Sequence, residues 1–245
     1  INYNLSKSKI ISSAKSFHRY VQFKGMMTKF KSGVYEIPPQ STMVEVIELL
    51  TKGTGITESV TIPEGKNMYE IGKILEKAGF VKYTDFVKKG KDLQFIAELG
   101  IEGDSVEGFL FPETYRFTPG SSIEMIVKSM VSQHFKRAKK FDFSKTSLTP
   151  FEVITLASIV EKETGAGFER PRIAGVFLNR LKKRMRLQSD PTTIYGIFEN
   201  FNGNLRKKHL LEKTAYNTYK IPGLPKGPIC NPGDKAIEAV LSARS

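Results

Sequence analysis

Residues 149–164 read Thr-Pro-Phe-Glu-Val-Ile-Thr-Leu-Ala-Ser-Ile-Val-Glu-Lys-Glu-Thr, and this stretch predicts an unusually apolar helix. Thr149 can cap its first turn, Pro150 suits the first helical position, and Glu152 completes a capping box three residues after the threonine. A Gly-Ala-Gly sequence directly after the stretch ends the helix. The apolar run is well short of the roughly 20 residues that a membrane helix needs, so we expect a soluble domain around it.

Two carboxylates, Glu161 and Glu163, lie in the last turn of this predicted helix. Because they are two residues apart, they point to sides of the helix roughly 200° apart. Glu163 follows an aliphatic stack formed three, four and seven positions earlier, whereas the stack before Glu161 contains Ser158. A carboxyl against aliphatic side chains loses hydration when charged and keeps its proton, as a general acid requires, which favours Glu163. The alternative is that both glutamates are surface residues at a helix end.

Polar side chains dominate two later segments. After a second predicted helix over residues 169–183, residues 185–196 are dense in hydroxyls, amides and a carboxylate, and residues 216–219 read Tyr-Asn-Thr-Tyr. Aromatic faces beside amide and hydroxyl groups suit a sugar chain, whose C–H faces are apolar and whose edges are polar. The candidate sugar-contacting residues are Gln188, Asp190, Thr192, Tyr195, Asn217 and Tyr219. The sequence has no Gly-rich phosphate loop, no Ser/His/Asp set and no nucleotide fingerprint.

The 245-residue chain is basic, with 38 Lys and Arg against 25 Asp and Glu and a formal net charge of +13. This excess favours an anionic partner or surface. A single cysteine excludes an internal disulfide and a cysteine-based zinc site, and the three histidines lie far apart without a metal-ligand spacing. We therefore expect no metal and no cofactor. The lack of disulfides fits the cytosol and many periplasmic proteins alike.

A weak internal repeat is present in the first third of the chain. Residues 35–53 and 62–79 each read as a short strand, an Ile-Pro turn and a helix with apolar residues three and four apart. One interpretation is a small wall-binding module of the LysM type, in which a strand and helices form a groove for sugars. The other is two ordinary βα units that share only their turn chemistry.

The first 34 residues form a basic segment, which predicts a helix between Lys7 and Lys31 with aromatic residues among the cations. Such a segment can bind nucleic acid or an anionic membrane surface. A solvated helix that packs its aromatic residues on the domain is the more common case. Since the basic residues do not gather in a recognised module, we expect no nucleic-acid partner. Further helices are predicted over residues 84–103 and 121–140.

Several motifs together resemble the YceG-like (MltG) family of endolytic murein transglycosylases. They are Glu-Gly-Phe-Leu-Phe-Pro at 107–112, Ala-Ser-Ile-Val-Glu-Lys-Glu-Thr at 157–164, Val-Phe-Leu-Asn-Arg-Leu at 176–181, Met-Arg-Leu-Gln-Ser-Asp-Pro-Thr at 185–192, Tyr-Asn-Thr-Tyr at 216–219 and Gly-Leu-Pro at 223–225. They occur in order, and the resemblance covers roughly residues 33–242.

We predict the α+β fold class: a small LysM-like βα module followed by a mainly helical catalytic domain with short strands. The predicted divisions are a basic helical segment at 1–34, the LysM-like module at 35–83 and a YceG-like catalytic domain at 84–245. The resemblance implies an N-terminal membrane helix and a C-terminal family segment that this chain lacks. It also implies a single-pass protein of the inner (cytoplasmic) membrane, with its catalytic domain on the periplasmic, extracytoplasmic side.

The implied activity is cleavage of the MurNAc–GlcNAc bond in nascent peptidoglycan strands to give 1,6-anhydroMurNAc ends, in association with peptidoglycan synthases. The family's catalytic glutamate is carried onto Glu163, because Glu-Thr here resembles the Glu-Ser pair of other lytic transglycosylases, with Glu161 as the fallback. One carboxyl can give its proton to the glycosidic oxygen and then take the proton of the sugar's own C6 hydroxyl. A second carboxylate, which ordinary glycosidases need, is then unnecessary.

Two other functions stay open at this stage. Asp190 can act as a second carboxylate, which would make the protein a hydrolytic muramidase. Alternatively, the chain is a non-catalytic peptidoglycan-binding module in which the LysM-like region does all the binding.

Overall fold

The computed structural model describes residues 2–31, 33–53 and 55–243. The chain divides into two compact units, residues 1–59 with 116–121 and residues 60–115 with 122–245. Two of the three division points fall inside the strands β1 (Glu58–Thr61) and β2 (Thr114–Phe117), which pair as a two-stranded sheet, and the third lies between residues 121 and 122. Every candidate active-site residue belongs to the second unit.

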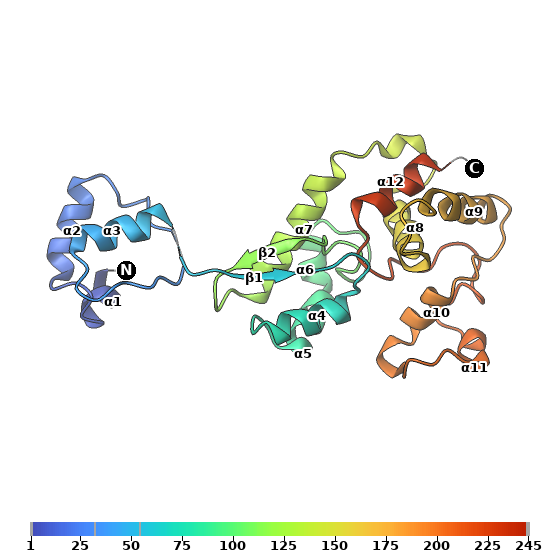
Figure 1. Ribbon diagram of the computed structural model, residues 1–245, viewed down its shortest axis with the longest axis horizontal. Coiled ribbons are helices and arrows are strands. Elements are labelled where there is room, and N and C mark those ends of the chain that lie inside the picture. Colours follow the sequence, from blue (N-terminus) through green and yellow to red (C-terminus); the bar gives the residue numbers. More distant parts are fainter. Residues whose placement is uncertain (1, 32, 54, 244–245) are drawn as a thin grey trace. The chain divides into compact units, whose positions relative to one another are not determined.

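The first unit is a helical cluster of α1 (Asn2–Lys7), α2 (Ala14–Phe23) and α3 (Met43–Lys52) (Figure 1). The side chain of Ser13 caps α2, and Thr42 and Glu45 form a capping box at the start of α3. Its buried core comprises Leu5, Ile11, Phe17, Val21, Val46, Ile47 and Leu50.

The predicted basic helix between Lys7 and Lys31 is wrong in its extent. Only α2 is helical in this range, because residues 8–13 turn and Lys9 adopts a left-handed φ of +56°. Phe17, one of the interleaved aromatic residues, is buried in the core and stacks on Phe30. Phe17 therefore packs in the core of the first unit, which agrees with the interpretation of this segment as a solvated helix that packs its aromatic residues on the domain.

The LysM-like module predicted at 35–83 is not confirmed. Its two helices form as α3 and α4 (Met68–Lys77), but they belong to different compact units. Its second strand forms as β1, whereas residues 35–38 are not a strand. The boundaries predicted at 34 and 83 therefore do not coincide with the division between the units.

The second unit begins with helices that follow β1 and continues through a mainly helical fold. Its first half contains α4, α5 (Tyr83–Gly90), α6 (Leu93–Glu98), β2 and α7 (Ile123–Ala138). Its second half contains η1 (Phe143–Lys145), α8 (Pro150–Glu163), α9 (Arg170–Lys182), α10 (Asp190–Gly196), η2 (Phe198–Asn200), α11 (Lys207–Leu211) and α12 (Asp234–Ser242). The α+β class is confirmed, with two short strands in the described part of the chain.

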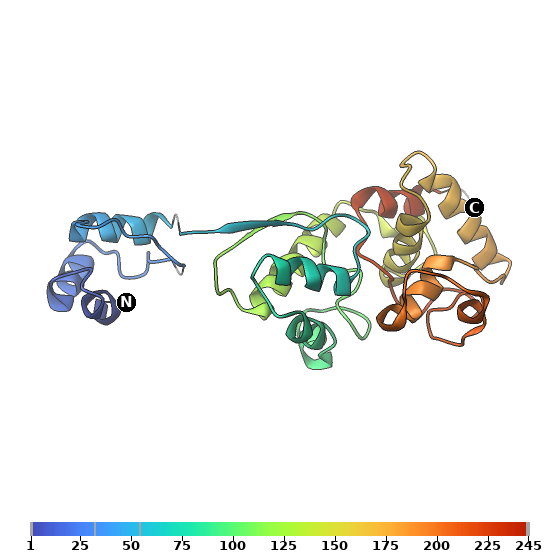
Figure 2. The ribbon, with the colours of Figure 1, turned by 60° about the horizontal axis from the view of Figure 1, so that its bottom comes forward.

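Helix α8 lies at the centre of the second unit, as its composition predicts. Thr149 and Glu152 form the expected capping box, and all eight residues from Val153 to Val160 are buried. The helix packs against α9, α10 and α12, and Figure 2 shows α8 in yellow beside the red α12 and the ochre α9. No helix in the described residues is long and apolar enough to cross a membrane.

Candidate active site

Glu163 is the last residue of α8, and its side chain is exposed to solvent. Its Oε1 accepts a hydrogen bond of 2.5 Å from the hydroxyl of Ser189. No hydrogen bond from the described residues reaches Oε2. The predicted burial of Glu163 against the aliphatic stack is wrong, because the helix ends at this residue and nothing covers its outer side. Glu163 is instead an accessible carboxylate with one oxygen held and the other open.

Glu161 is the buried glutamate of the pair, with a side chain only 5% exposed. Its Oε1 lies 2.6 Å from Nη2 of Arg170, which is itself 8% exposed, and its Oε2 accepts a hydrogen bond of 3.1 Å from the backbone N–H of Gly233. Burial raises the pKa of Glu161, while the Gly233 N–H and the Arg170 charge oppose that shift. Glu161 therefore joins α8 to α9 and to the start of α12.

Asp190 and Tyr219 lie near Glu163 on the exposed side of α10. The hydroxyl of Tyr219 donates a hydrogen bond of 2.7 Å to Oδ1 of Asp190. Burial raises the pKa of Tyr219 to about 12, and the Asp190 carboxylate and the Glu163 charge add to the shift. The exposed Gln188, which has a left-handed φ of +52°, lies just before Ser189. These three predicted residues are accessible to a ligand beside Glu163.

Thr192 and Asn217 are fully buried, so the prediction that they contact sugars is not supported. The hydroxyls of Thr192 and Thr218 share a hydrogen bond of 2.8 Å, and Thr218 Oγ1 accepts the backbone N–H of Ser189 at 3.0 Å. Asn217 Oδ1 accepts the backbone N–H of Tyr219 at 3.0 Å. The Thr193 hydroxyl donates a hydrogen bond of 3.1 Å to the same Asn217 oxygen. Thr192 and Asn217 therefore join α10 to the 217–219 segment from the interior.

Tyr195 is also buried, and its hydroxyl faces the protein interior instead of a ligand. It donates a hydrogen bond of 3.0 Å to Oε2 of Glu107, which is 1% exposed. Glu107 also accepts the backbone N–H of Met68 at 2.9 Å and the side-chain amide of Asn231 at 2.8 Å. Burial raises the pKa of Glu107 to about 8, although hydrogen bonds from the Met68 N–H, the Tyr195 hydroxyl and the Gly108 N–H partly offset the rise.

Ser189, Arg170 and Glu107 are functional candidates that were not predicted from the sequence. The sequence signals for Glu107 are its place as the first residue of the 107–112 motif and as a lone acid within the otherwise apolar run 106–111. Ser189 precedes Asp190-Pro191 and looks like an ordinary helix cap. Nothing local marks Arg170 as a buried partner.

The arrangement around Glu163 suits proton transfer by a single carboxyl group. In the described part of the chain, no three His, Cys, Asp or Glu side chains gather closely enough to hold a metal ion. Glu163 Oε2 faces open space, its Oε1 is fixed by Ser189, and Asp190 is fixed by Tyr219.

Comparisons with known proteins agree with the resemblance noted in the sequence. The model of the YceG-like family matches residues 1–245. An endolytic murein transglycosylase of Bacillus subtilis is 34% identical and aligns over 97% of this chain and 70% of its own length. One from Streptococcus pneumoniae serotype 2 is 28% identical over 99% of this chain, which spans half of that relative. A crystal structure of a YceG-like protein from Listeria monocytogenes superimposes with a TM-score of 0.71 at 31% identity, covering 100% of this chain and 86% of that one.

Proposed function

This chain belongs to the YceG-like family, and on that premise we propose that it is a lytic transglycosylase that cuts peptidoglycan glycan strands within their length. The names of the relatives support the substrate class. The observation that carries the chemistry is the exposed Glu163, with Ser189 bonded to one carboxylate oxygen and the other oxygen open.

Glu163 serves as both acid and base in the proposed reaction. Its protonated Oε2 gives the proton to the glycosidic oxygen as the bond between MurNAc C1 and that oxygen breaks. The resulting carboxylate takes the proton of the C6 hydroxyl as that oxygen bonds to C1 and forms the 1,6-anhydro ring. No water is consumed, because the nucleophile belongs to the substrate. Ser189 keeps Oε1 in place during both transfers.

The accessible neighbours of Glu163 are the proposed sugar-contacting groups. Gln188 and Asp190 flank Ser189, which binds Glu163, and Tyr219 is bonded to Asp190, so these residues offer amide, carboxylate and phenol groups close to Glu163 in the fold. Thr192, Asn217 and Tyr195 are proposed to support these groups from the interior, in place of the sugar contacts predicted for them. Asp190 supplies a second carboxylate close to Glu163. Since ordinary glycosidases use two carboxylates, hydrolysis is the alternative reaction that the experiment must distinguish.

Peptidoglycan lies outside the cytoplasmic membrane, so the proposed substrate implies an extracytoplasmic site of action. Anchoring of the protein in the inner membrane by a helix ahead of residue 1, and its association with peptidoglycan synthases, are proposals that rest on the resemblance alone.

The first unit supports a wall-binding role as a second candidate function. It contains a pocket of about 380 Å³ whose lining includes Phe30, Tyr35 and Ile37. Aromatic and apolar walls of this kind suit the C–H faces of sugars. A binding-only protein would keep its function in a Glu163→Gln variant and lose it when Tyr35 is replaced by Ala.

Digestion of purified glycan strands in H₂¹⁸O tests the proposed reaction. The transglycosylase gives new 1,6-anhydro ends without ¹⁸O, and the new ends lie within long strands from early times. Reducing ends that carry ¹⁸O would show a hydrolase instead. Strands left intact by the folded parent protein would leave only the binding role.

A further inference from the structure

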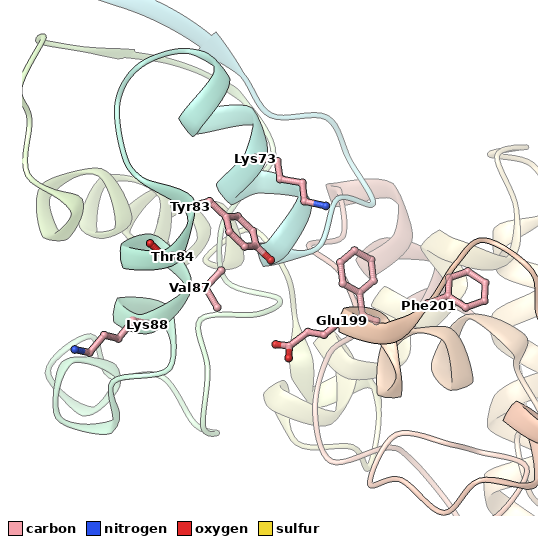
Figure 3. Close-up of a pocket in the computed structure, with 8 residues that line it drawn as sticks. Lys73, Tyr83, Thr84, Val87, Lys88, Glu199 and Phe201 are labelled. Atoms are coloured by element: carbon pink, nitrogen blue, oxygen red, sulfur yellow. The ribbon is translucent and has the colours of Figure 1, made fainter.

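A separate pocket of about 620 Å³ lies in the second unit between helices α4 and α5 and the η2 turn. We name it the α5–η2 pocket, and its lining includes Lys73, Lys88, Tyr83, Phe198, Glu199 and Phe201. Figure 3 shows Lys73, Tyr83 and Lys88 extending from one part of the fold and Glu199 and Phe201 from another, with Lys73 and Tyr83 opposite Glu199. None of them takes part in the site around Glu163.

The α4–α5 side of the pocket is cationic. Lys73 and Lys88 are exposed, and neither forms an ion pair with a carboxylate among the described residues. The Lys73 ammonium lies over the Tyr83 ring, 5.9 Å from its centre. Because this contact uses the ring face and no carboxylate, the ammonium can still pair with a carboxylate of a ligand. This side therefore suits carboxylate groups.

The η2 side offers the opposite charge on an aromatic wall. Phe198 stacks on Tyr69 with ring centroids 5.1 Å apart, so its ring is held in place. The Glu199 carboxylate is 3.3 Å from Lys91 and is 63% exposed, which leaves room for a second ammonium. A ligand for this pocket thus carries carboxylates and an amine on a partly apolar chain. A polyphosphate fits less well, because Glu199 repels it.

The pocket connects to the proposed catalytic residue through one short helix. Ser189, which binds Glu163, directly precedes α10, and η2 follows that helix after one residue. Helix α10 has seven residues, a length of about 10 Å at 1.5 Å per residue. A pentapeptide extends up to about 17 Å at roughly 3.4 Å per residue, so a peptide that branches from a strand bound at Glu163 is long enough to span α10.

We propose that the α5–η2 pocket binds the peptide that branches from each MurNAc of the glycan strand. This rests on the proposed function, because the peptide is part of the proposed substrate. One carboxylate of the peptide faces Lys73, a second faces Lys88 at the rim of the pocket, where the Lys88 ammonium points away from Glu199 (Figure 3), and the side-chain amine of the diamino acid faces Glu199. The pocket gives the enzyme a preference for strands that still carry peptides over stripped strands.

The first test measures binding of the N-acetylated stem peptide acetyl-L-Ala-γ-D-Glu-L-Lys-D-Ala-D-Ala by NMR, independently of catalysis. The acetyl group replaces the amide bond that joins the peptide to MurNAc. We expect saturable shifts of the amides of residues 73–88 and 198–201 in the full chain. Replacing Lys73 and Lys88 together by Gln should weaken binding about fivefold, since exposed ion pairs each contribute modestly. The matched control replaces Lys77 and Lys82, two exposed lysines of the same region outside the pocket, and should bind like the parent.

The second test separates the two charges of the ligand. Glu199→Gln should weaken binding of the stem peptide with an acetylated N-terminus more than binding of the same peptide with its lysine side chain acetylated as well, because only the former has an amine for Glu199. No saturable shift in the parent, shifts confined to other residues, or equal affinities of the parent and the Lys73/Lys88 variant would overturn the proposal.

Cleavage rates distinguish this proposal from the proposed function. The parent should cut peptide-bearing strands faster than amidase-stripped strands, and the Lys73/Lys88 variant should lose that preference while it cuts stripped strands at the parent rate. If the peptide binds at the pocket but no strand is cut, the proposed function fails and the pocket stands. If strands are cut and the peptide does not bind, the pocket proposal alone fails.

Discussion

The hydroxyl of Ser189 donates a hydrogen bond of 2.5 Å to Oε1 of Glu163 and so joins the end of α8 to the start of α10. Ser189 occupies the N-cap position of α10, yet its side chain makes no capping hydrogen bond to that helix. Its backbone N–H is already held by Thr218. The hydroxyl therefore serves Glu163 and contributes little to α10.

Ser189→Ala should lower kcat on glycan strands about tenfold with little change in KM, because Glu163 remains present and loses only its positioning donor. Ser189→Thr retains the hydroxyl and should recover most of the rate. Because the side chain does not cap α10, the unfolding free energy of Ser189→Ala should stay within about 1 kcal/mol of the parent. A threonine variant as slow as the alanine variant, with both folded, would contradict the positioning role.

Glu163→Gln should reduce cleavage by about 10²- to 10⁴-fold, since general acid–base catalysis typically contributes that much. The side chain is exposed, so the urea-unfolding midpoint should hardly change. If Glu163 were buried against aliphatic side chains, the same substitution would instead stabilise the protein. The assignment to Glu163 fails if the folded Gln variant turns over strands at the parent rate.

Glu161→Gln should act on stability first. Removing one partner of a buried ion pair leaves the Arg170 charge poorly compensated, which costs about 3 kcal/mol. Urea unfolding with circular dichroism measures the loss. Per folded molecule, cleavage should stay within about tenfold of the parent, well above Glu163→Gln. A stable but inactive Glu161→Gln protein would move the catalytic role from Glu163 to Glu161.

Glu107 should make stability fall as the pH rises from about 4.5 to 8. Folding raises its pKa from 4.5 to about 8, so the folded chain holds one more proton than the unfolded chain across that window. Each pH unit there lowers the unfolding free energy by up to about 1.4 kcal/mol. Glu107→Gln does not ionise, so its stability relative to the parent should improve between pH 5 and pH 8. Parallel curves for the two proteins from urea unfolding would contradict this account.

Local sequence predicted the helices well where their ends carry strong signals. The capping box of Thr149 and Glu152 and the following apolar run define α8 without reference to any other part of the chain. The sequence did not predict that the two copies of the internal repeat fall in different compact units. Helices α3 and α4 have similar patterns, yet each packs in a different unit, because periodicity gives the buried face of a helix and not its partner.

The sequence by itself determined that two carboxylates stand at the end of an apolar helix and that polar segments follow it. Only the tertiary structure decided which carboxylate is buried. Arg170 and Gly233 cover Glu161 from positions 9 and 72 residues further along the chain. Glu163 lies at the open end of α8 and, among the described residues, accepts a side-chain hydrogen bond from Ser189 alone. Burial depends on what packs against a side chain, and those neighbours come from distant parts of the chain that helical periodicity does not encode.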